Sequence, residues 1–254
     1  MTDLQFNTDE LQLYFGEPFT IKTKSENTIQ IFQPTIGDIL KNGERNVYSV
    51  VNTFIANPTM YRMKLWDMGI DWNKIDDFQL FCMLIPTLEG KPTSLLFGDI
   101  DFQEFNLYKE DKDGESIFFL YNEKQNIEID ETVYLQISGY IKMMFNLFPK
   151  VEKARGKSTK EWIIMEEKQQ MELNQNTSYK STLLPLISSC LNHPGFKYKK
   201  NELYDVGIVE FMDSVKRLQV YESSTALLKG VYSGFVDTSK IDKEEFDFMR
   251  QITR

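Results

Sequence analysis

Two hydrophobic periods run through this sequence, and each is confined to its own stretches of the chain. Between residues 47 and 55, apolar residues recur at i, i+3, i+4, i+7 and i+8, the pattern of one buried helical stripe. Between residues 95 and 130, the period changes toward the alternation that is typical of strands. Because stretches with the helical period outnumber those that alternate, the sequence predicts an α+β fold that is predominantly helical, with a short N-terminal hairpin at residues 19–32 and a small antiparallel meander.

Side chains that cap helices predict where the main helices begin. A hydroxyl or carboxylate directly before an apolar stripe can accept hydrogen bonds from the free amides of the first helical turn. The residues in such positions are Thr35, Asp76 and Asp130. Within the meander, turns are expected at Asp113-Gly114 and at residues 122–126.

We expect two parts that are joined by a basic linker. Residues 1–148 contain the hairpin, the meander and a long helix, and form the α+β part. Residues 149–160 are interpreted as a solvated basic linker, because blocks of charge with a glycine are usually loops. The basic residues of the linker are Lys150, Lys153, Arg155, Lys157 and Lys160. Residues 161–254 form the helical C-terminal part.

The C-terminal part is expected to contain several separate helices. Ser158 and Glu161 have the spacing of a capping box, in which a hydroxyl and a carboxylate each bind a backbone amide at a helix start, so a helix is expected from Thr159. This helix is apolar at first and polar in its second half, which is expected to project into solvent or to contact a partner. Further helices are expected at residues 183–191, 208–218, 228–235 and 242–252.

The composition favours binding over catalysis. The chain has 19 Phe, 12 Tyr and 3 Trp but a single His, and histidine is the commonest metal ligand and proton carrier near neutral pH. No glycine-rich phosphate loop and no G-x-S-x-G motif occurs. We therefore expect no enzymatic activity, no metal and no cofactor. The alternative is a divalent-cation site at Asp99 and Asp101, whose D-x-D spacing occurs in nucleotide-sugar enzymes, although turns and helix caps also explain this pair.

Charge and hydropathy exclude further partner classes. The net charge of −9 disfavours binding to nucleic acid and to anionic membranes. The longest uninterrupted apolar run is much shorter than the roughly 20 residues of a membrane span, and the first residues do not resemble a signal peptide. Cys82 and Cys190 lie in apolar runs and are expected to be buried thiols, although their spacing leaves a disulfide open. A cytoplasmic protein is expected.

Two sets of residues are candidates for protein binding. Ala226, Gly230 and Gly234 recur every four residues, and on a helix they would form a bare strip that another backbone could approach closely. The alternative is that Gly230 and Gly234 end helices or form turns. The second set is Trp66, Trp72 and Trp162. Tryptophan is enriched at interface hot spots, with ordinary partial burial as the alternative.

Several long strings of the sequence resemble one protein family. They are QIFQPTIGDIL (30–40), LWDMGIDWNKIDDFQLF (65–81), LFGDIDF (96–102), STKEWIIMEE (158–167) and ALLKGVYSGFVDTSKIDKEEFDFMR (226–250). Together they resemble tail-assembly proteins of tailed phages of Gram-positive bacteria, described as tail assembly chaperones or as relatives of baseplate-hub assembly proteins. The resemblance implies a non-catalytic factor of tail morphogenesis in the host cytoplasm. It also implies phage tail proteins as partners, either the tape-measure protein or baseplate components, and it carries over no catalytic residue.

Two other functions stay open at this point. The chain could be a structural tail or baseplate subunit that is retained in the virion, or a metal-dependent enzyme that uses Asp99 and Asp101. The sequence does not determine the client or the oligomeric state, and a homo-oligomer is compatible with either non-catalytic function. Abundant aromatic residues and 11 Met suit adaptable binding surfaces.

Overall fold

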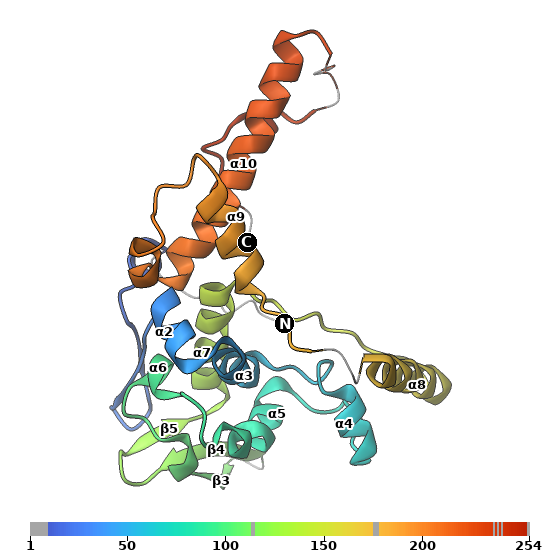
Figure 1. The fold of residues 1–254 in the computed structure, drawn as a ribbon. Helices are drawn as coiled ribbons and strands as arrows, with labels where there is room; N and C mark the ends of the chain where they lie inside the picture. Colours follow the sequence, from blue (N-terminus) through green and yellow to red (C-terminus); the bar gives the residue numbers. More distant parts are fainter. Residues whose placement is uncertain are drawn as a thin grey trace.

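The described part of the chain is built around one long central helix. The computed structural model describes residues 10–112, 115–174, 178–235, 237, 239 and 241–252. Helix α7 (Glu131–Phe145) lies in the middle, the meander lies at one end, and α10 (Ile208–Tyr232) extends from the other end (Figure 1). Helix α8 (Lys157–Asn174) projects to one side. The predicted α+β fold, predominantly helical with two small antiparallel sheets, is confirmed.

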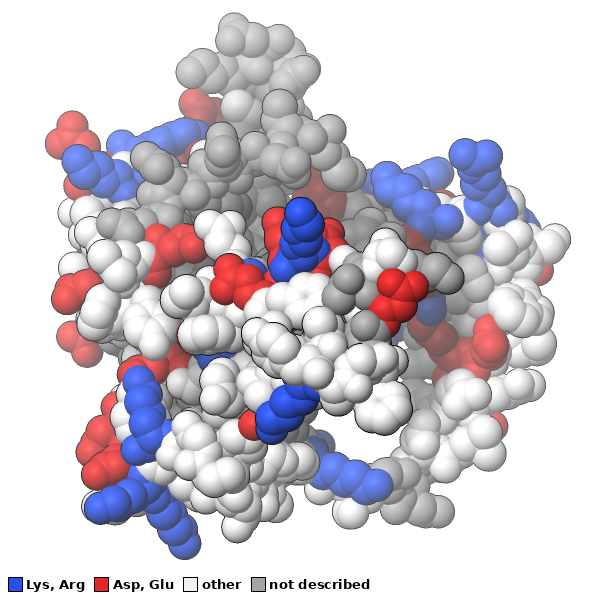
Figure 2. All heavy atoms as spheres, turned by 90° about the horizontal axis from the view of Figure 1, so that it is seen from above, with Lys and Arg blue, Asp and Glu red and all other residues white. Residues whose placement is uncertain are grey.

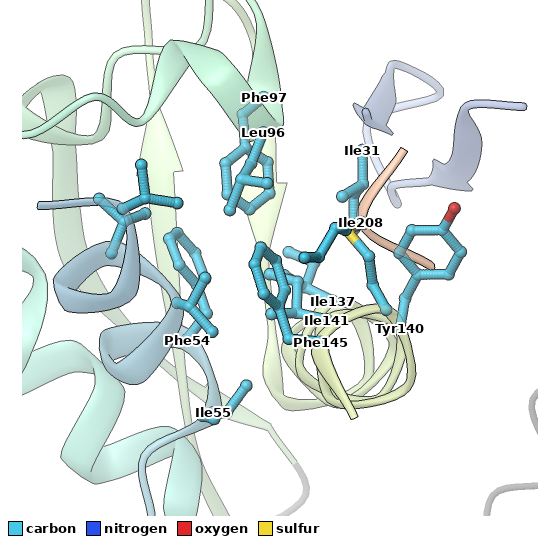
Figure 3. Packing of buried hydrophobic residues seen from close by; sticks show 14 of the residues in the cluster. Ile31, Phe54, Ile55, Leu96, Phe97, Ile137, Tyr140, Ile141, Phe145 and Ile208 are labelled. Carbon is cyan, nitrogen blue, oxygen red and sulfur yellow. The ribbon is translucent and has the colours of Figure 1, made fainter. Parts of the chain in front are cut away.

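Helix α7 forms where a capping residue precedes an apolar stripe. The Asp130 carboxylate accepts a hydrogen bond from the Val133 amide at 2.8 Å, which satisfies a free donor of the first turn. The helix ends at Asn146, whose φ of 51° and ψ of 45° are left-handed. Figure 3 shows Ile137 and Ile141 on the side of α7 that packs against α3 (Glu44–Ile55). Both isoleucines are fully buried, so α7 is the centre of the core.

The predicted hairpin and meander are both present. The strands are β1 (Phe19–Lys22), β2 (Thr28–Ile31), β3 (Phe105–Lys112), β4 (Glu115–Asn122) and β5 (Ile127–Ile129). In the hairpin, the register places Ile21 opposite Ile29, and both side chains are buried on one face. The second sheet has the order β3-β4-β5 with antiparallel pairs. The turn predicted at Asp113-Gly114 lies outside the described residues.

The other two predicted caps are also confirmed. Thr35 and Asp38 form a reciprocal capping box at the start of α2 (Ile36–Asn42), with the Asp38 amide donating to the Thr35 hydroxyl at 3.1 Å. Asp76 accepts from the Gln79 amide at 2.7 Å at the start of α5 (Asp77–Leu84). The remaining helices are α1 (Glu10–Tyr14), α2 (Ile36–Asn42), α4 (Arg62–Asp67), α5 (Asp77–Leu84), α6 (Ser94–Phe97) and α9 (Leu183–Asn192), with 3-10 helices η1 (Ile85–Leu88), η2 (Phe102–Glu104), η3 (Glu202–Asp205) and η5 (Lys243–Phe246).

The main core contains residues from before and after the basic linker. Buried side chains of α9 and α10, such as Cys190, Ile208 and Phe211, belong to the same apolar cluster as α3 and α7. The Ile208 amide donates to the Pro34 carbonyl at 3.0 Å, so the start of α10 lies beside the start of α2. A Cβ atom at Gly207 would clash with the Gln33 side chain. A larger residue at this position would displace the Gln33 side chain, whose Oε1 accepts a hydrogen bond from the Val209 amide.

The structure corrects three predicted helix boundaries in the C-terminal part. Helix α8 begins at Lys157, so Ser158 lies within its first turn and is not the residue that precedes it. The two helices predicted at residues 208–218 and 228–235 are one continuous helix, α10. Asp242 caps a short segment as predicted, but this segment is the 3-10 helix η5, and residues 247–252 are not helical.

Candidate protein-binding surfaces

Ion pairs attach helix α8 to helix α4. The Lys160 ammonium lies 2.6 Å from an Asp71 carboxylate oxygen, just beyond α4. The Arg62 guanidinium contacts Glu167 at 2.5 Å, and it also pairs with Glu152 of the basic linker at 2.7 Å. A third pair joins α8 to the end of α4: Lys168–Asp67, at 2.6 Å. The basic linker is thus docked on the body at Arg62, and Asn57 holds it further through the Pro149 and Lys150 carbonyls.

These ion pairs shift the pKa of Asp71 and of Arg62. The hydrogen bond that Lys160 donates to Asp71 holds the pKa of Asp71 below its usual value, and the hydrogen bond that Arg62 donates to Glu167 raises the pKa of Arg62. Asp71 and Arg62 are thus held in their charged forms by their partners on α8, which supports the docking of this helix. The sequence did not indicate that Arg62 and Asp71 pair with α8. Arg62 precedes Glu167 by 105 positions and Asp71 precedes Lys160 by 89, and no local pattern predicts contacts over such separations.

The face of α8 that points away from α4 is exposed and partly apolar. At 100° per residue, the helix places Lys160, Ile164 and Glu167 on the side toward α4. Ile164 is the one buried residue that the structure shows in this helix. On the opposite side lie Trp162, Met165 and Leu173, of which Trp162 is 57% exposed and Leu173 77% exposed. We call these three residues the α8 outer face.

The three candidate tryptophans lie in different environments. Trp66 and Trp72 contact each other edge to face, with 6.0 Å between ring centroids. Trp72 is buried, Trp66 is half-buried, and the Lys160 ammonium lies 5.5 Å from the centre of the Trp72 ring. Only Trp162 of the three is exposed on the surface. Among these candidates, Trp162 is therefore the one available to a partner without rearrangement.

The predicted strip of small residues on α10 is interrupted. Ala226 and Gly230 lie within the helix, but the helix ends at Tyr232, and Gly234 follows with a φ of 75°. The Phe235 amide donates to the Gly230 carbonyl at 3.0 Å, which closes the helix end around Gly234. The prediction of one helical strip is thus wrong at Gly234, which ends the helix as the alternative proposed.

The far end of α10 nevertheless presents apolar side chains to solvent. Tyr232 and Phe235 are 86% and 90% exposed at the tip that extends from the body (Figure 1). Lower on the helix, Ser224 and Arg217 donate hydrogen bonds to carbonyls of residues 245–250, so this side of α10 is covered by the C-terminal segment. Ala226 is on the uncovered surface.

The residues considered for catalysis have structural contacts. The Asp101 carboxylate accepts from the Gln103 amide at 2.9 Å and caps η2, while the Asp99 carbonyl accepts from the Gln125 side chain. Within the described residues, no group of three or more His, Cys, Asp or Glu is arranged to hold a metal. His193 contacts Glu222 at 3.1 Å and accepts from the Gly195 amide. Cys82 and Cys190 are free thiols, half-buried and buried respectively.

The charges on the surface are mixed. On the face seen in Figure 2, Lys and Arg are interspersed with Asp and Glu, and neither sign forms a continuous patch there. In the part of the chain that the structure describes, no helix is long and apolar enough to cross a membrane.

Comparisons with protein-family models, with curated proteins and with solved structures give no match for this chain.

Proposed function

We propose that this chain is a non-catalytic factor of phage tail morphogenesis, a chaperone or adaptor that binds a tail component such as the tape-measure protein in the host cytoplasm. The family resemblance of the strings at residues 30–40, 65–81 and 226–250 motivates the assignment to phage tails. The observation that carries protein binding is the α8 outer face, where Trp162, Met165 and Leu173 are exposed on a projecting helix.

Exposed apolar side chains on a projecting helix suit the capture of another helix. A partner that buries them removes apolar area from water, and large anchors such as Trp162 contribute most of the binding energy in typical interfaces. A helix that binds in the groove of a partner uses apolar side chains at positions i, i+3, i+4 and i+7. On the α8 outer face, Trp162 and Met165 have the i, i+3 spacing. The client is thus expected to present an apolar helical stripe, such as a segment of a long helical tail protein.

Co-expression with the tape-measure protein of the same phage tests this proposal. The chain should increase the soluble yield of the client, and the double variant Trp162→Ser, Leu173→Ser should abolish this increase. Met171→Ser is the matched control, because Met171 is also exposed on α8 but lies on the other side of the helix. If the outer-face variant and the control both retain full activity, the α8 outer face is not the binding surface.

Mass spectrometry of purified virions separates the proposal from its alternative. A chaperone should be absent from mature particles, because it leaves when its client assembles. A stoichiometric amount of the chain in the particle would instead identify a structural tail or baseplate subunit.

A further inference from the structure

A pocket of about 820 Å³ lies next to the attachment of α8, between segments that are far apart in the sequence. Its walls come from the loop after α3, from residues 72–78, from one face of α7 and from residues 148–153. Its volume falls within the range of roughly 300–1,000 Å³ that is usual for small-molecule sites. The three residues of the α8 outer face do not contribute to this wall, so the pocket is a separate surface.

Much of the pocket wall is apolar. Phe78 comes from α5, Leu135 and Met143 come from α7, and Phe148 and Val151 come from the segment that leads into α8. These side chains can enclose an aromatic or branched aliphatic group and remove its surface from water.

The Lys142 ammonium is a polar group of the wall that a ligand can reach. Three other polar atoms, Nε1 of Trp72, Oδ1 of Asn73 and Oγ of Ser138, have no hydrogen bond, but each has less than 1 Å² of accessible area and is out of reach. Lys142 is half-buried on the α7 side of the pocket, and its Nζ keeps accessible area. A molecule in the pocket can therefore contact this nitrogen.

The Lys142 side chain has no counter-charge in contact. Within the described part of the chain, no carboxylate oxygen lies within 4.0 Å of its Nζ, and this nitrogen donates no hydrogen bond there. Asp77 acts on it electrostatically from a greater distance. The other charged residues of the wall are Asp76, Glu131, Glu152 and Lys153.

Burial among apolar groups favours the neutral form of this lysine. It lowers the pKa of Lys142, and the charge of Asp77 opposes this effect. A lysine is a nucleophile only as the neutral amine, and desolvation in an apolar pocket is a usual way to activate it toward carbonyl compounds. The pocket thus combines an accessible nucleophile with space for an apolar group.

We propose that Lys142 binds an apolar aldehyde covalently and reversibly, as an imine, with the apolar group in this pocket. The Nζ lone pair attacks the carbonyl carbon and forms a C–N bond. The C–O bond then breaks, and the carbonyl oxygen leaves as water with both protons of the amine, which completes the C=N bond. The step needs no oxidant or reductant. The apolar group lies against Phe78, Leu135 and Phe148.

Reductive trapping of the imine tests this proposal on the full-length protein. Cyanoborohydride converts an imine into a stable secondary amine, and peptide mass spectrometry locates it. With hydrocinnamaldehyde at about pH 7, Lys142 should be modified about tenfold faster than the exposed Lys22, as expected when a phenyl group is removed from water. Acetaldehyde has the same reactive group without the apolar part, and its preference for Lys142 should be much smaller.

Two variants place the reaction in the pocket. Leu135→Trp should fill the pocket and remove the preference of hydrocinnamaldehyde for Lys142. Leu107→Trp is the control, because Leu107 is exposed on β3 and not in the pocket wall. Lys142→Arg keeps the positive charge but offers no neutral amine, and should leave only the modification of other lysines such as Lys22. Circular dichroism verifies that each variant is folded, and the comparison of the two aldehydes on the unaltered protein remains decisive if Leu135→Trp does not fold.

The pH dependence tests the neutral amine. The preference for Lys142 should shrink between about pH 7 and about pH 10, because ordinary lysines also lose their protons in that range. A preference that stays constant over this range would contradict the proposal. Equal modification of Lys142 and Lys22 by hydrocinnamaldehyde, the same preference with acetaldehyde, or a preference that Leu135→Trp leaves unchanged would overturn it.

Discussion

Helices α7 and α8 are of similar length, but they are attached to the molecule by different forces. The structure shows eight buried residues in α7, whose 15 residues cross the core, and one in α8, which has 18 residues. Apolar packing holds α7, whereas ion pairs with Arg62, Asp67 and Asp71 hold α8. Apolar burial is neither screened by salt nor dependent on a titrating group, whereas ion pairs are screened by salt and depend on pH. A helix of the second kind can keep one face free for a partner and can respond to its surroundings.

Truncation of a buried side chain in α7 should have the largest effect. Ile141→Ala leaves a cavity in the centre of the core and should lower the global free energy of unfolding by about 2–5 kcal/mol. Urea denaturation measures the change. Leu184→Ala on the exposed side of α9 is the control and should change stability by less than about 0.5 kcal/mol. A small effect of Ile141→Ala would show that α7 is not the centre of the core.

Removal of the Arg62 charge should loosen α8 and the basic linker but not α7. Arg62→Met keeps most of the apolar stem but deletes the pairs to Glu152 and Glu167, which are partly exposed and worth about 1 kcal/mol after solvent screening. Hydrogen exchange should accelerate in α8 and stay unchanged in α7. Lys157→Met, which removes only an exposed pair within α8, should have no measurable effect. Equal acceleration in both helices would contradict separate attachment.

Salt should weaken the attachment of α8 to a smaller extent. Raising NaCl from about 0.05 M to about 1 M shortens the Debye length to roughly 3 Å and screens the exposed parts of these pairs. Protection of α8 amides should fall, while protection of α7 amides should be maintained. In Arg62→Met, the fall should be smaller because fewer pairs remain. Salt-independent protection of α8 would assign its attachment to apolar contacts such as that of Ile164.

The smallest expected effect concerns the titration of Asp71. Its pKa is lowered in the folded protein, so the Lys160 pair stabilises the docked state above the pKa of an unfolded Asp. That contribution is lost as the pH falls through the lowered folded pKa. An NMR titration of the Asp71 carboxyl carbon should give a midpoint below that of an unpaired Asp. Lys160→Met should move the midpoint upward, and an unchanged midpoint would exclude this pair as the cause.

Local chemistry explains why much of the fold could be predicted. Thr35, Asp76 and Asp130 each accept a hydrogen bond from the amide three residues later, so each cap depends only on nearby sequence. The register of β1 and β2 follows from a short turn and from the alternation that buries Ile21 and Ile29.

Distant contacts explain why helix α10 was divided in the prediction. The stretch at residues 219–227 continues no apolar stripe, so the sequence predicts separate helices at residues 208–218 and 228–235. In the folded chain, Ser224 is buried because its hydroxyl donates to the Glu245 carbonyl, and Tyr221 packs against Phe248. The C-terminal segment thus covers one side of this stretch, and tertiary packing overrides the local pattern.

The candidate sites differ in the same way. The polar second half of α8 predicted that this part of the helix projects, but the sequence left open whether Trp162, in its apolar first turns, is exposed or partly buried. The pocket of about 820 Å³ beside Trp72 could not be predicted, because its walls come from segments between residues 58 and 153 that only the fold brings together. By itself, the sequence determined the caps, the two hydrophobic periods and hence the helical α+β class, since these depend on neighbouring residues. The tertiary structure decided which charges pair with α8 and how far α10 continues, since both depend on groups that are distant along the chain and meet only after the core has formed.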